Sequence, residues 1–273
     1  MNQSAILVFG FYLLISLSSC LEEISIEEYV GEPSGRLVVE GLITNEKKAH
    51  FIKLTRTTNV IPKAPANPVT GASISISDGD TIFLFAEKET GSGIYLTDST
   101  VQGEAGKTYT LNIVVDGKTY EASDKMEPPN AFDKSDLLSI YFRPDKSGGY
   151  VNQLFTVAYG ADSPSMVSYA IVNPRPQDKY TEIWYYTFPG ADVDNIIPTP
   201  TESLEFVQGT IFRQVKYSLS NEHYLFLRAV LLETKYAGGI LGSVRANVPT
   251  NISNGGLGFF GACSVTERLK EIK

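Results

Sequence analysis

The sequence predicts a mainly β protein, in which an N-terminal immunoglobulin-like β-sandwich is followed by a β-rich domain carrying one C-terminal helix. The composition supports this class, because the 273 residues include 15 Tyr, 14 Phe and 23 Gly, which are frequent in strands and turns. Apolar and polar residues alternate over short runs, which is the pattern of strands with one buried face. Asp-Gly pairs lie between such runs, and this pair is typical of β-hairpin turns.

The chain begins with an apolar run, Ala5 to Leu17, that ends at Leu17-Ser18-Ser19-Cys20. The run is shorter than the roughly 17 to 25 apolar residues that span a membrane. We therefore expect a secretory signal over residues 1–19 rather than an N-terminal membrane helix. Leu-Ser-Ser-Cys is similar to a bacterial lipobox, whose Cys is acylated and becomes the first residue of the mature chain. Cys20 is thus the predicted lipidation site, and several acyl chains would hold the protein on a membrane.

Residues 20–35 are predicted to form an acidic tether. The segment contains five glutamates and ends near Pro33, and it has no apolar periodicity. Cys20-Leu21-Glu22-Glu23 resembles the signal that sends Bacteroidota surface lipoproteins to the outer face of the outer membrane. The alternative is that the carboxylates only keep the tether solvated and extended.

Residues 36–127 are predicted to form the immunoglobulin-like β-sandwich. Asp78-Gly79 and Asp116-Gly117 are expected to be two-residue hairpin turns, in which both residues need a positive φ. Short strands at regular spacing with turns between them favour a sandwich. Glu127-Pro128-Pro129-Asn130 marks the expected boundary. The predicted inward-facing residues are Leu37, Val39, Ile43, Ile52, Leu54, Ile74, Ile76, Tyr109, Leu111, Ile113, Val115, Tyr120 and Ala122.

Residues 131–273 are predicted to form the second, less regular domain. A helix is expected near residues 221–236, after the N-cap Ser220 and before Gly238-Gly239. One side of this helix should carry Leu225, Ala229 and Leu232. A glycine-rich strand is expected from Leu257 to Val265. Other predicted strands show alternation at Phe155, Val157 and Tyr159, at Val167, Tyr169 and Ile171, and at Ile211, Val215 and Tyr217.

An aromatic run is the best candidate for a ligand-binding site in the sequence. Trp184, Tyr185 and Tyr186 lie next to a long Pro- and Asp-containing loop that includes Asp192 and Asp194. Tyr and Trp provide large contact areas and dominate binding hot spots. The alternative is that these rings fill the core of the second domain.

The chain offers little material for catalysis or metal binding. Its only histidines, His50 and His223, fit no zinc spacing and are expected to be partly exposed structural residues. Asp192-Val193-Asp194-Asn195 is similar to half of a calcium loop but lacks the Gly and Glu that should follow. Cys263 lies in an apolar strand, where a buried, unreactive thiol is expected. We predict no catalytic residue, no metal site and no cofactor beyond the covalent lipid on Cys20.

The net charge and two short patterns complete the set of candidates. A net charge of -8 gives no basic surface for nucleic acid, so we predict no nucleic-acid partner.

Asp98-Ser99-Thr100 and Asp80-Thr81-Ile82 are similar to the short O-glycosylation acceptor of exported Bacteroidota proteins. Ser99 and Thr81 are therefore candidate glycosylation sites.

Several motifs in order along the chain resemble one family, the Bacteroidota lipoproteins called domain of unknown function 4249. The resemblance covers nearly the whole mature chain, although Cys263 stands where an aromatic residue often follows Gly-Ala in the family. The motifs are Leu37-Val38-Val39-Glu40-Gly41-Leu42-Ile43-Thr44-Asn45, Leu54-Thr55-Arg56-Thr57, Val69-Thr70-Gly71-Ala72, Gly93-Ile94-Tyr95, Gly106-Lys107-Thr108-Tyr109-Thr110-Leu111, Lys118-Thr119-Tyr120-Glu121-Ala122 and Asn251-Ile252-Ser253-Asn254-Gly255-Gly256-Leu257-Gly258-Phe259-Phe260-Gly261-Ala262.

The resemblance implies a location and a class of partner. Members are outer-membrane lipoproteins, commonly encoded beside TonB-dependent receptors, and no catalytic residues are established for them. We therefore expect a non-enzymatic protein, lipid-anchored in the cell outer membrane and facing the exterior. Its expected function is that of a substrate-capture or scaffold subunit of a TonB-dependent nutrient transporter, with a small nutrient as possible ligand. The alternatives are a stand-alone surface adhesin or structural module, and a degradative enzyme.

Overall fold

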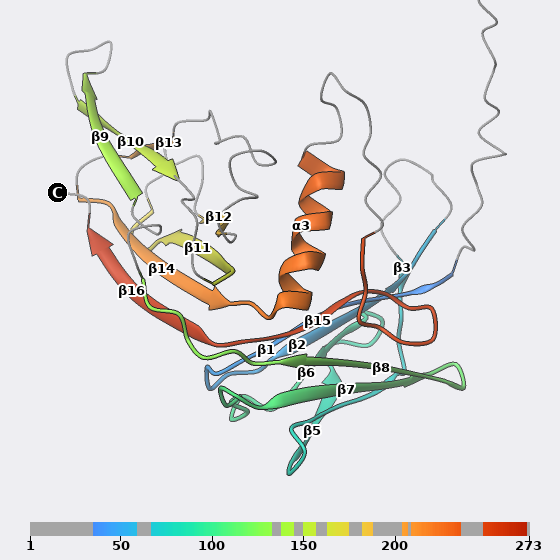
Figure 1. Ribbon diagram of the computed structural model, residues 1–273. Helices are drawn as coiled ribbons and strands as arrows, with labels where there is room; N and C mark the ends of the chain where they lie inside the picture. The colour runs from blue at the N-terminus through green and yellow to red at the C-terminus, as the bar shows by residue number, and fades with distance from the viewer. Residues whose placement is uncertain are drawn as a thin grey trace, which may run out of the picture.

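The chain forms three β-sheets and one α-helix in the part that the computed structural model describes, which is residues 35–58, 67–132, 138–144, 150–156, 163–174, 182–187, 204–206, 209–235 and 248–271. Figure 1 shows the first sheet below the helix, with the other two sheets to one side. A mainly β protein with one helix near its C-terminal end is therefore confirmed. In this described part, no helix has both the length and the apolar character needed to cross a bilayer.

The first sheet has nine strands in the order β15-β1-β2-β6-β5-β4-β7-β8, with β3 beside β2. It is nearly closed, because β8 returns to lie beside β15, and the expected immunoglobulin-like sandwich is not confirmed. The strands are β1 (Leu37–Thr44), β2 (Phe51–Arg56), β3 (Asn67–Pro68), β4 (Ser73–Ser77), β5 (Ile82–Glu87), β6 (Ile94–Leu96), β7 (Thr108–Val115), β8 (Lys118–Lys125) and β15 (Leu257–Cys263).

The other two sheets and the helix come from the second half of the chain. The second sheet has four strands in the order β12-β11-β14-β16, and the third sheet has three strands in the order β13-β10-β9. Their strands are β9 (Leu138–Pro144), β10 (Tyr150–Thr156), β11 (Ser165–Ile171), β12 (Glu182–Thr187), β13 (Leu204–Phe206), β14 (Ile211–Ser218) and β16 (Val265–Glu271), and the helix is α3 (Asn221–Lys235).

The core of the first sheet confirms the predicted alternation. All thirteen residues predicted to face inward are at most 5% exposed and belong to one hydrophobic cluster. The same cluster contains Ile252, Phe260 and Ala262, which lie in the predicted second domain. Strand β15 pairs in parallel with β1 along its whole length, from Val38 opposite Leu257 to Thr44 opposite Cys263. The domain limits stay a prediction, but the core of the first part includes residues from the C-terminal part.

The two Asp-Gly pairs form different turns. Asp116 and Gly117 have φ values of 51° and 70°, so the predicted two-residue hairpin between β7 and β8 is confirmed. The same prediction for Asp78-Gly79 is wrong, because Ser77 pairs with Ile82 and four residues form the loop. The Asp78 carboxylate accepts the N–H groups of Asp80 and Thr81 at 3.0 and 2.7 Å, and these bonds stabilise the longer loop.

The helix predicted near residues 221–236 is confirmed as α3. Helix α3 begins after Ser220, whose Oγ accepts the N–H of His223 at 3.1 Å as an N-cap should. Leu225 is 44% exposed and Ala229 is buried, so the side predicted to carry both residues is only partly buried. His223 and Tyr224 are the buried residues of the first turn.

Two strands of the second half also differ from expectation. Strand β14 is more buried on the face opposite the predicted one, where Phe212, Gln214, Lys216 and Ser218 are buried, whereas Ile211 and Tyr217 on the predicted face are partly exposed. The strand expected from Leu257 to Val265 is two strands, β15 and β16, separated by Ser264. At Ser264 the chain passes from the first sheet to the second, and the Ser264 hydroxyl donates to the carbonyl oxygen of Glu127.

Candidate functional site

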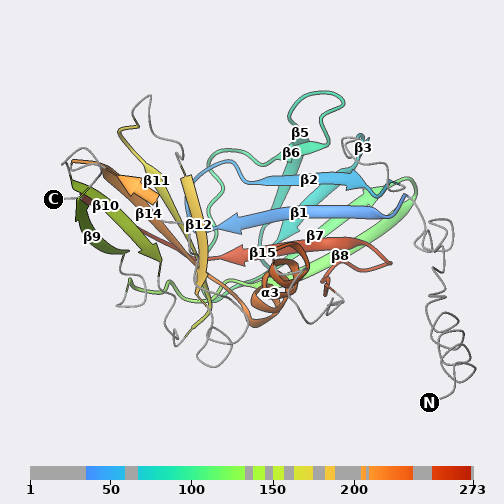
Figure 2. The same cartoon turned by 90° about the horizontal axis from the view of Figure 1, so that it is seen from above.

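A cavity of about 690 Å³ lies between the outer face of the first sheet and helix α3. The alternation of β1 creates its floor, because Leu37, Val39 and Ile43 enter the core while Leu42 faces the opposite side. Figures 1 and 2 both place α3 over β15 and β1, with the second sheet beside them. Met166 of β11 and Tyr217 of β14 complete the lining from that second sheet.

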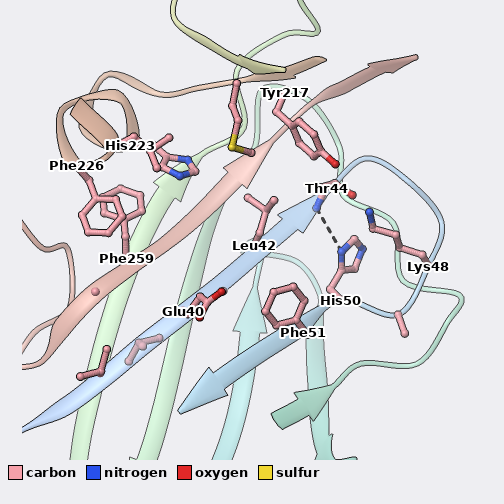
Figure 3. A pocket seen from close by; sticks show the side chains of 17 residues that line it. Glu40, Leu42, Thr44, Lys48, His50, Phe51, Tyr217, His223, Phe226 and Phe259 are labelled. Carbon is pink, nitrogen blue, oxygen red and sulfur yellow. Dashed lines mark hydrogen bonds between the residues drawn. The ribbon is translucent and has the colours of Figure 1, made fainter. Parts of the chain in front are cut away.

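One end of the cavity is a wall of stacked rings. The ring centroids of His223 and Phe259 are 4.8 Å apart, and those of Phe226 and Phe259 are 5.0 Å apart, with nearly parallel planes. His223 and Phe226 are three residues apart on α3, so they share one face of the helix. Phe259 reaches them from β15. Figure 3 shows the three rings together at one end of the cavity.

The other end of the cavity is polar. Figure 3 shows Lys48, His50 and the Tyr217 hydroxyl there, with Leu42 between them and the aromatic wall. The N–H of Thr44 donates to Nδ1 of His50 at 3.4 Å, and the N–H of His50 donates to Oγ1 of Thr97 at 2.9 Å. Burial lowers the pKa of His50, and the charge of Lys48 lowers it further. His50 is therefore neutral at neutral pH.

The charged side chains at the cavity have partners of opposite charge. Lys48 pairs with Glu46, whose other carboxylate oxygen lies 3.8 Å from Nη2 of Arg213. Glu40, on the outer face of β1, lies 3.4 Å from Nζ of Lys53. The ionic groups around the cavity are thus already compensated.

Behind the aromatic wall, His223 contacts the buried thiol of Cys263. The distance between Sγ of Cys263 and Nδ1 of His223 is 3.6 Å. Burial raises the pKa of the Cys263 thiol well above its ordinary value, and Asp124 raises it further. Burial lowers the pKa of His223 to about 4. The pair is therefore a neutral thiol and a neutral imidazole at pH 7, the opposite of the thiolate and imidazolium that nucleophilic catalysis requires.

Asp124 of β8 connects β15 to the start of α3 through hydrogen bonds to Ala262 and Ser220, and it was not singled out from the sequence. Its carboxylate accepts the N–H of Ala262 at 2.8 Å, the N–H of Lys125 at 3.0 Å and a hydrogen bond from Ser220. Burial raises its pKa to about 6, although these hydrogen bonds lower it. The parity of β8 is the signal that could have found it, since Asp124 follows the inward-facing Tyr120 and Ala122 at the same spacing.

Of the predicted site residues, Ser99 and Thr81 do not line this cavity, and the side chains of the others lie outside the described part of the chain. Cys20, Asp192 and Asp194 belong to the part of the chain that the structure does not describe. Trp184, Tyr185 and Tyr186 lie in β12, where Tyr186 pairs with Met166, and their backbone alone is described. Their assignment to core or binding surface stays a prediction. Ser99 and Thr81 are exposed in loops, and their glycosylation stays a prediction.

The histidines are the clearest correction to the sequence prediction. Both were expected to be partly exposed, but His50 is 2% and His223 8% exposed, and both line the cavity. His223 is buried because it stacks on Phe259 of β15, and His50 is hydrogen-bonded to Thr44 and Thr97. These contacts join distant parts of the chain, and the local sequence does not indicate them. Among the described residues, no three His, Cys, Asp or Glu side chains converge as metal ligands would.

The comparison with known proteins identifies one family. A sequence model described as domain of unknown function (DUF4249) matches residues 22–268. No curated protein matches the chain. The C-terminal motif has a structural role, since the Asn251 side chain donates to the carbonyl oxygen of Phe260 at 2.8 Å and accepts its N–H at 3.1 Å. Because the match spans nearly all of the sequence, the chain belongs to the DUF4249 family.

Proposed function

We propose that this protein is a lipid-anchored, non-catalytic accessory subunit of a TonB-dependent nutrient transporter, on the outer face of the outer membrane, and that its cavity captures the transported nutrient. The cavity is the observation that carries this proposal. Ligand sites are mostly apolar hollows of roughly 300–1,000 Å³ with a few polar groups. The cavity has such a volume, an aromatic wall at one end and polar groups at the other.

The protonation of the two histidines and of Cys263 supports binding rather than catalysis. A general acid or base works best with a pKa near the operating pH. His223 has a pKa of about 4, the pKa of His50 is lowered, and that of the Cys263 thiol is raised. These groups keep one protonation state through the neutral range and suit a site that binds its ligand unchanged.

The location in this proposal depends on Cys20. Residues 21–36 separate Cys20 from the first strand. A fully extended segment spans up to about 3.5 Å per residue, so this tether would let the folded part reach a receptor several tens of ångströms from its own anchor. The acidic character of the segment disfavours adhesion to anionic lipid.

Replacing Cys20 with serine tests the anchor. We expect the Cys20→Ser chain, once its signal is removed, to leave the membrane fraction, because a serine hydroxyl does not form the thioether that links the acyl chains to the protein. Fractionation of cells followed by immunoblotting measures this distribution. Cys263→Ser is the matched control and should stay in the membrane fraction. A Cys20→Ser chain that remains with the membrane would contradict the proposed placement.

Recovery of the partner tests the transporter role. The full chain, cross-linked in intact cells and purified from solubilised outer membrane, should recover a TonB-dependent receptor identified by mass spectrometry. Deletion of the gene should slow growth on the nutrient that this receptor imports. If no receptor is recovered under stringent washing and no defined nutrient shows a growth defect, the protein is instead a stand-alone adhesin or structural module.

A further inference from the structure

We infer that the cavity takes an uncharged small molecule with a planar, apolar body, of the class of neutral aromatic compounds. This inference deepens the proposed function and rests on it, since it names the class of nutrient that the cavity captures. Three observations carry it: the stacked rings, the compensated charges and an apolar path to the cavity.

The stacked rings favour a planar ligand. Phe226, Phe259 and His223 form one nearly parallel stack on the cavity wall, with centroid spacings of 4.8 and 5.0 Å. Aromatic faces gain extra attraction from another ring in an offset or edge-on arrangement. Met166 lines the same cavity, and a thioether also contacts aromatic rings favourably. A flat, apolar molecule satisfies these walls better than a flexible chain of similar volume.

The compensated charges favour an uncharged ligand over a charged one. Lys48 already pairs with Glu46, and Glu40 pairs with Lys53. His50 and His223 are buried and neutral. A charged group that enters the cavity would lose part of its hydration, and its counter-charge would have to come from Lys48 or Glu40, each of which already has a partner. The polar end, with the Tyr217 hydroxyl, suits an uncharged polar substituent instead.

An apolar path leads to the cavity across the outer face of the first sheet. Ala86 of β5 pairs with Leu96 of β6, Leu96 with Phe51 of β2, and Phe51 with Leu42 of β1. Directly opposed residues lie on one face of a sheet, so these four side chains form a continuous row. Phe51 is 41% exposed and lines the cavity, and Leu84 farther along β5 is 72% exposed. Exposed apolar rows of this kind mark surfaces that meet apolar molecules.

A matched pair of fluorescent dyes tests the inference. N-phenyl-1-naphthylamine is uncharged and aromatic, and 1-anilinonaphthalene-8-sulfonate is the same skeleton with one negative charge. Both are titrated into the mature chain, residues 20–273 with Cys20→Ser, which lacks the apolar signal and the lipid and needs no detergent, and fluorescence measures binding. We expect saturable binding of the neutral dye at one site per chain and at least about tenfold weaker binding of the sulfonate, because its charge finds no free partner.

Two neighbouring helix residues locate the bound dye. Phe226→Ala removes one ring of the wall and should weaken binding of the neutral dye about tenfold through lost stacking and lost apolar contact. Leu225→Ala is the matched control, since Leu225 is the adjacent residue but is exposed and does not line the cavity. It should leave dye binding unchanged, and circular dichroism checks that both variants are folded.

Three results would overturn the inference. These are no saturable binding of the neutral dye, equal or tighter binding of the sulfonate, and equal binding to wild type and Phe226→Ala. Failure of this inference can be distinguished from failure of the proposed function. If the receptor is recovered but the neutral dye does not bind, the transporter role stands and the ligand class is wrong. If the dye binds as expected but no receptor is recovered, the ligand class stands and the transporter role is wrong.

Discussion

Gly258→Ala should lower the free energy of unfolding by about 4 kcal/mol. Losses of this size are exceptional for a point mutation and arise from defects such as overpacking or backbone strain. Gly258 has a φ of +89°, a conformation that costs an L-residue roughly 1–2 kcal/mol. A Cβ at this position would also lie 2.0 Å from the carbonyl oxygen of Val39. Backbone cannot rotate away as a side chain can, so β15 would have to move from β1 and withdraw Phe260 from the core.

Gly255→Ala separates the two causes. Gly255 precedes the same strand and has a φ of +74°, but a Cβ there meets nothing within 4 Å. Its substitution should therefore cost only the roughly 1–2 kcal/mol of the backbone conformation. Urea denaturation of the mature chain, residues 20–273 with Cys20→Ser, followed by circular dichroism, measures both losses. Equal losses for the two variants would show that the close approach of Gly258 to Val39 adds nothing to the loss of stability.

The first sheet was predictable where the pattern is local. Residues such as Ile74, Ile76 and Leu111 alternate with polar neighbours, and period-two burial is encoded within each strand. The Asp116-Gly117 turn was predictable for the same reason, because both residues tolerate positive φ. Asp78-Gly79 has the same two residues, but the Asp78 carboxylate accepts the N–H of Thr81 within a longer loop and pairs with Lys107, which is 29 residues away. The contact with Lys107 cannot be seen in the local sequence.

The pairing of strands distant in sequence was not predictable. Strand β15 follows β1 by more than two hundred residues and lies parallel to it. Alternation shows that a strand has a buried face but does not indicate its neighbour. The division of the chain near Pro128 followed composition, whereas the core of the first sheet includes Phe260. A pairing of this kind leaves no short-range signal in one sequence.

The candidate site was missed for the same reason. Its walls come from β1, β15, α3 and the second sheet, so no contiguous run contains it. The aromatic run at Trp184 was predicted as a binding site because its residues are adjacent in sequence. Phe226 and Phe259, in contrast, come into contact only in the folded chain. The buried state of His223 likewise follows from the position of α3 over β15.

Asp124 and His223 should give the protein two opposite pH dependences that nearly cancel. The pKa of His223 falls from 6.5 in the unfolded chain to about 4 in the fold. Between these values the unfolded chain binds more protons, so stability falls as the pH falls. The pKa of Asp124 rises from 3.8 to about 6, so the folded chain binds more protons and stability falls as the pH rises. At 1.36 kcal/mol per pKa unit, each effect amounts to about 3 kcal/mol.

Single substitutions should expose each dependence, because the windows overlap between about pH 4 and pH 6. In Asp124→Asn the His223 effect is left alone, and the free energy of unfolding should drop by about 3 kcal/mol more than in the wild type between pH 7 and pH 4. In His223→Phe the Asp124 effect is left alone, and the same change of pH should raise stability by about 3 kcal/mol relative to the wild type.

The double variant provides the control for this pair. Removing both groups should restore the wild-type slope, because the remaining carboxylates contribute equally to all four proteins. Urea midpoints at intervals between pH 4 and pH 7 measure the four profiles. Parallel profiles for the wild type and both single variants would mean that neither group changes its pKa on folding. Opposite slopes in the single variants would instead show that a buried acid, Asp124, and a buried base, His223, lie behind the aromatic stack. Between about pH 4 and pH 6 both groups are neutral in the folded chain, because the pKa of the acid is raised and that of the base is lowered.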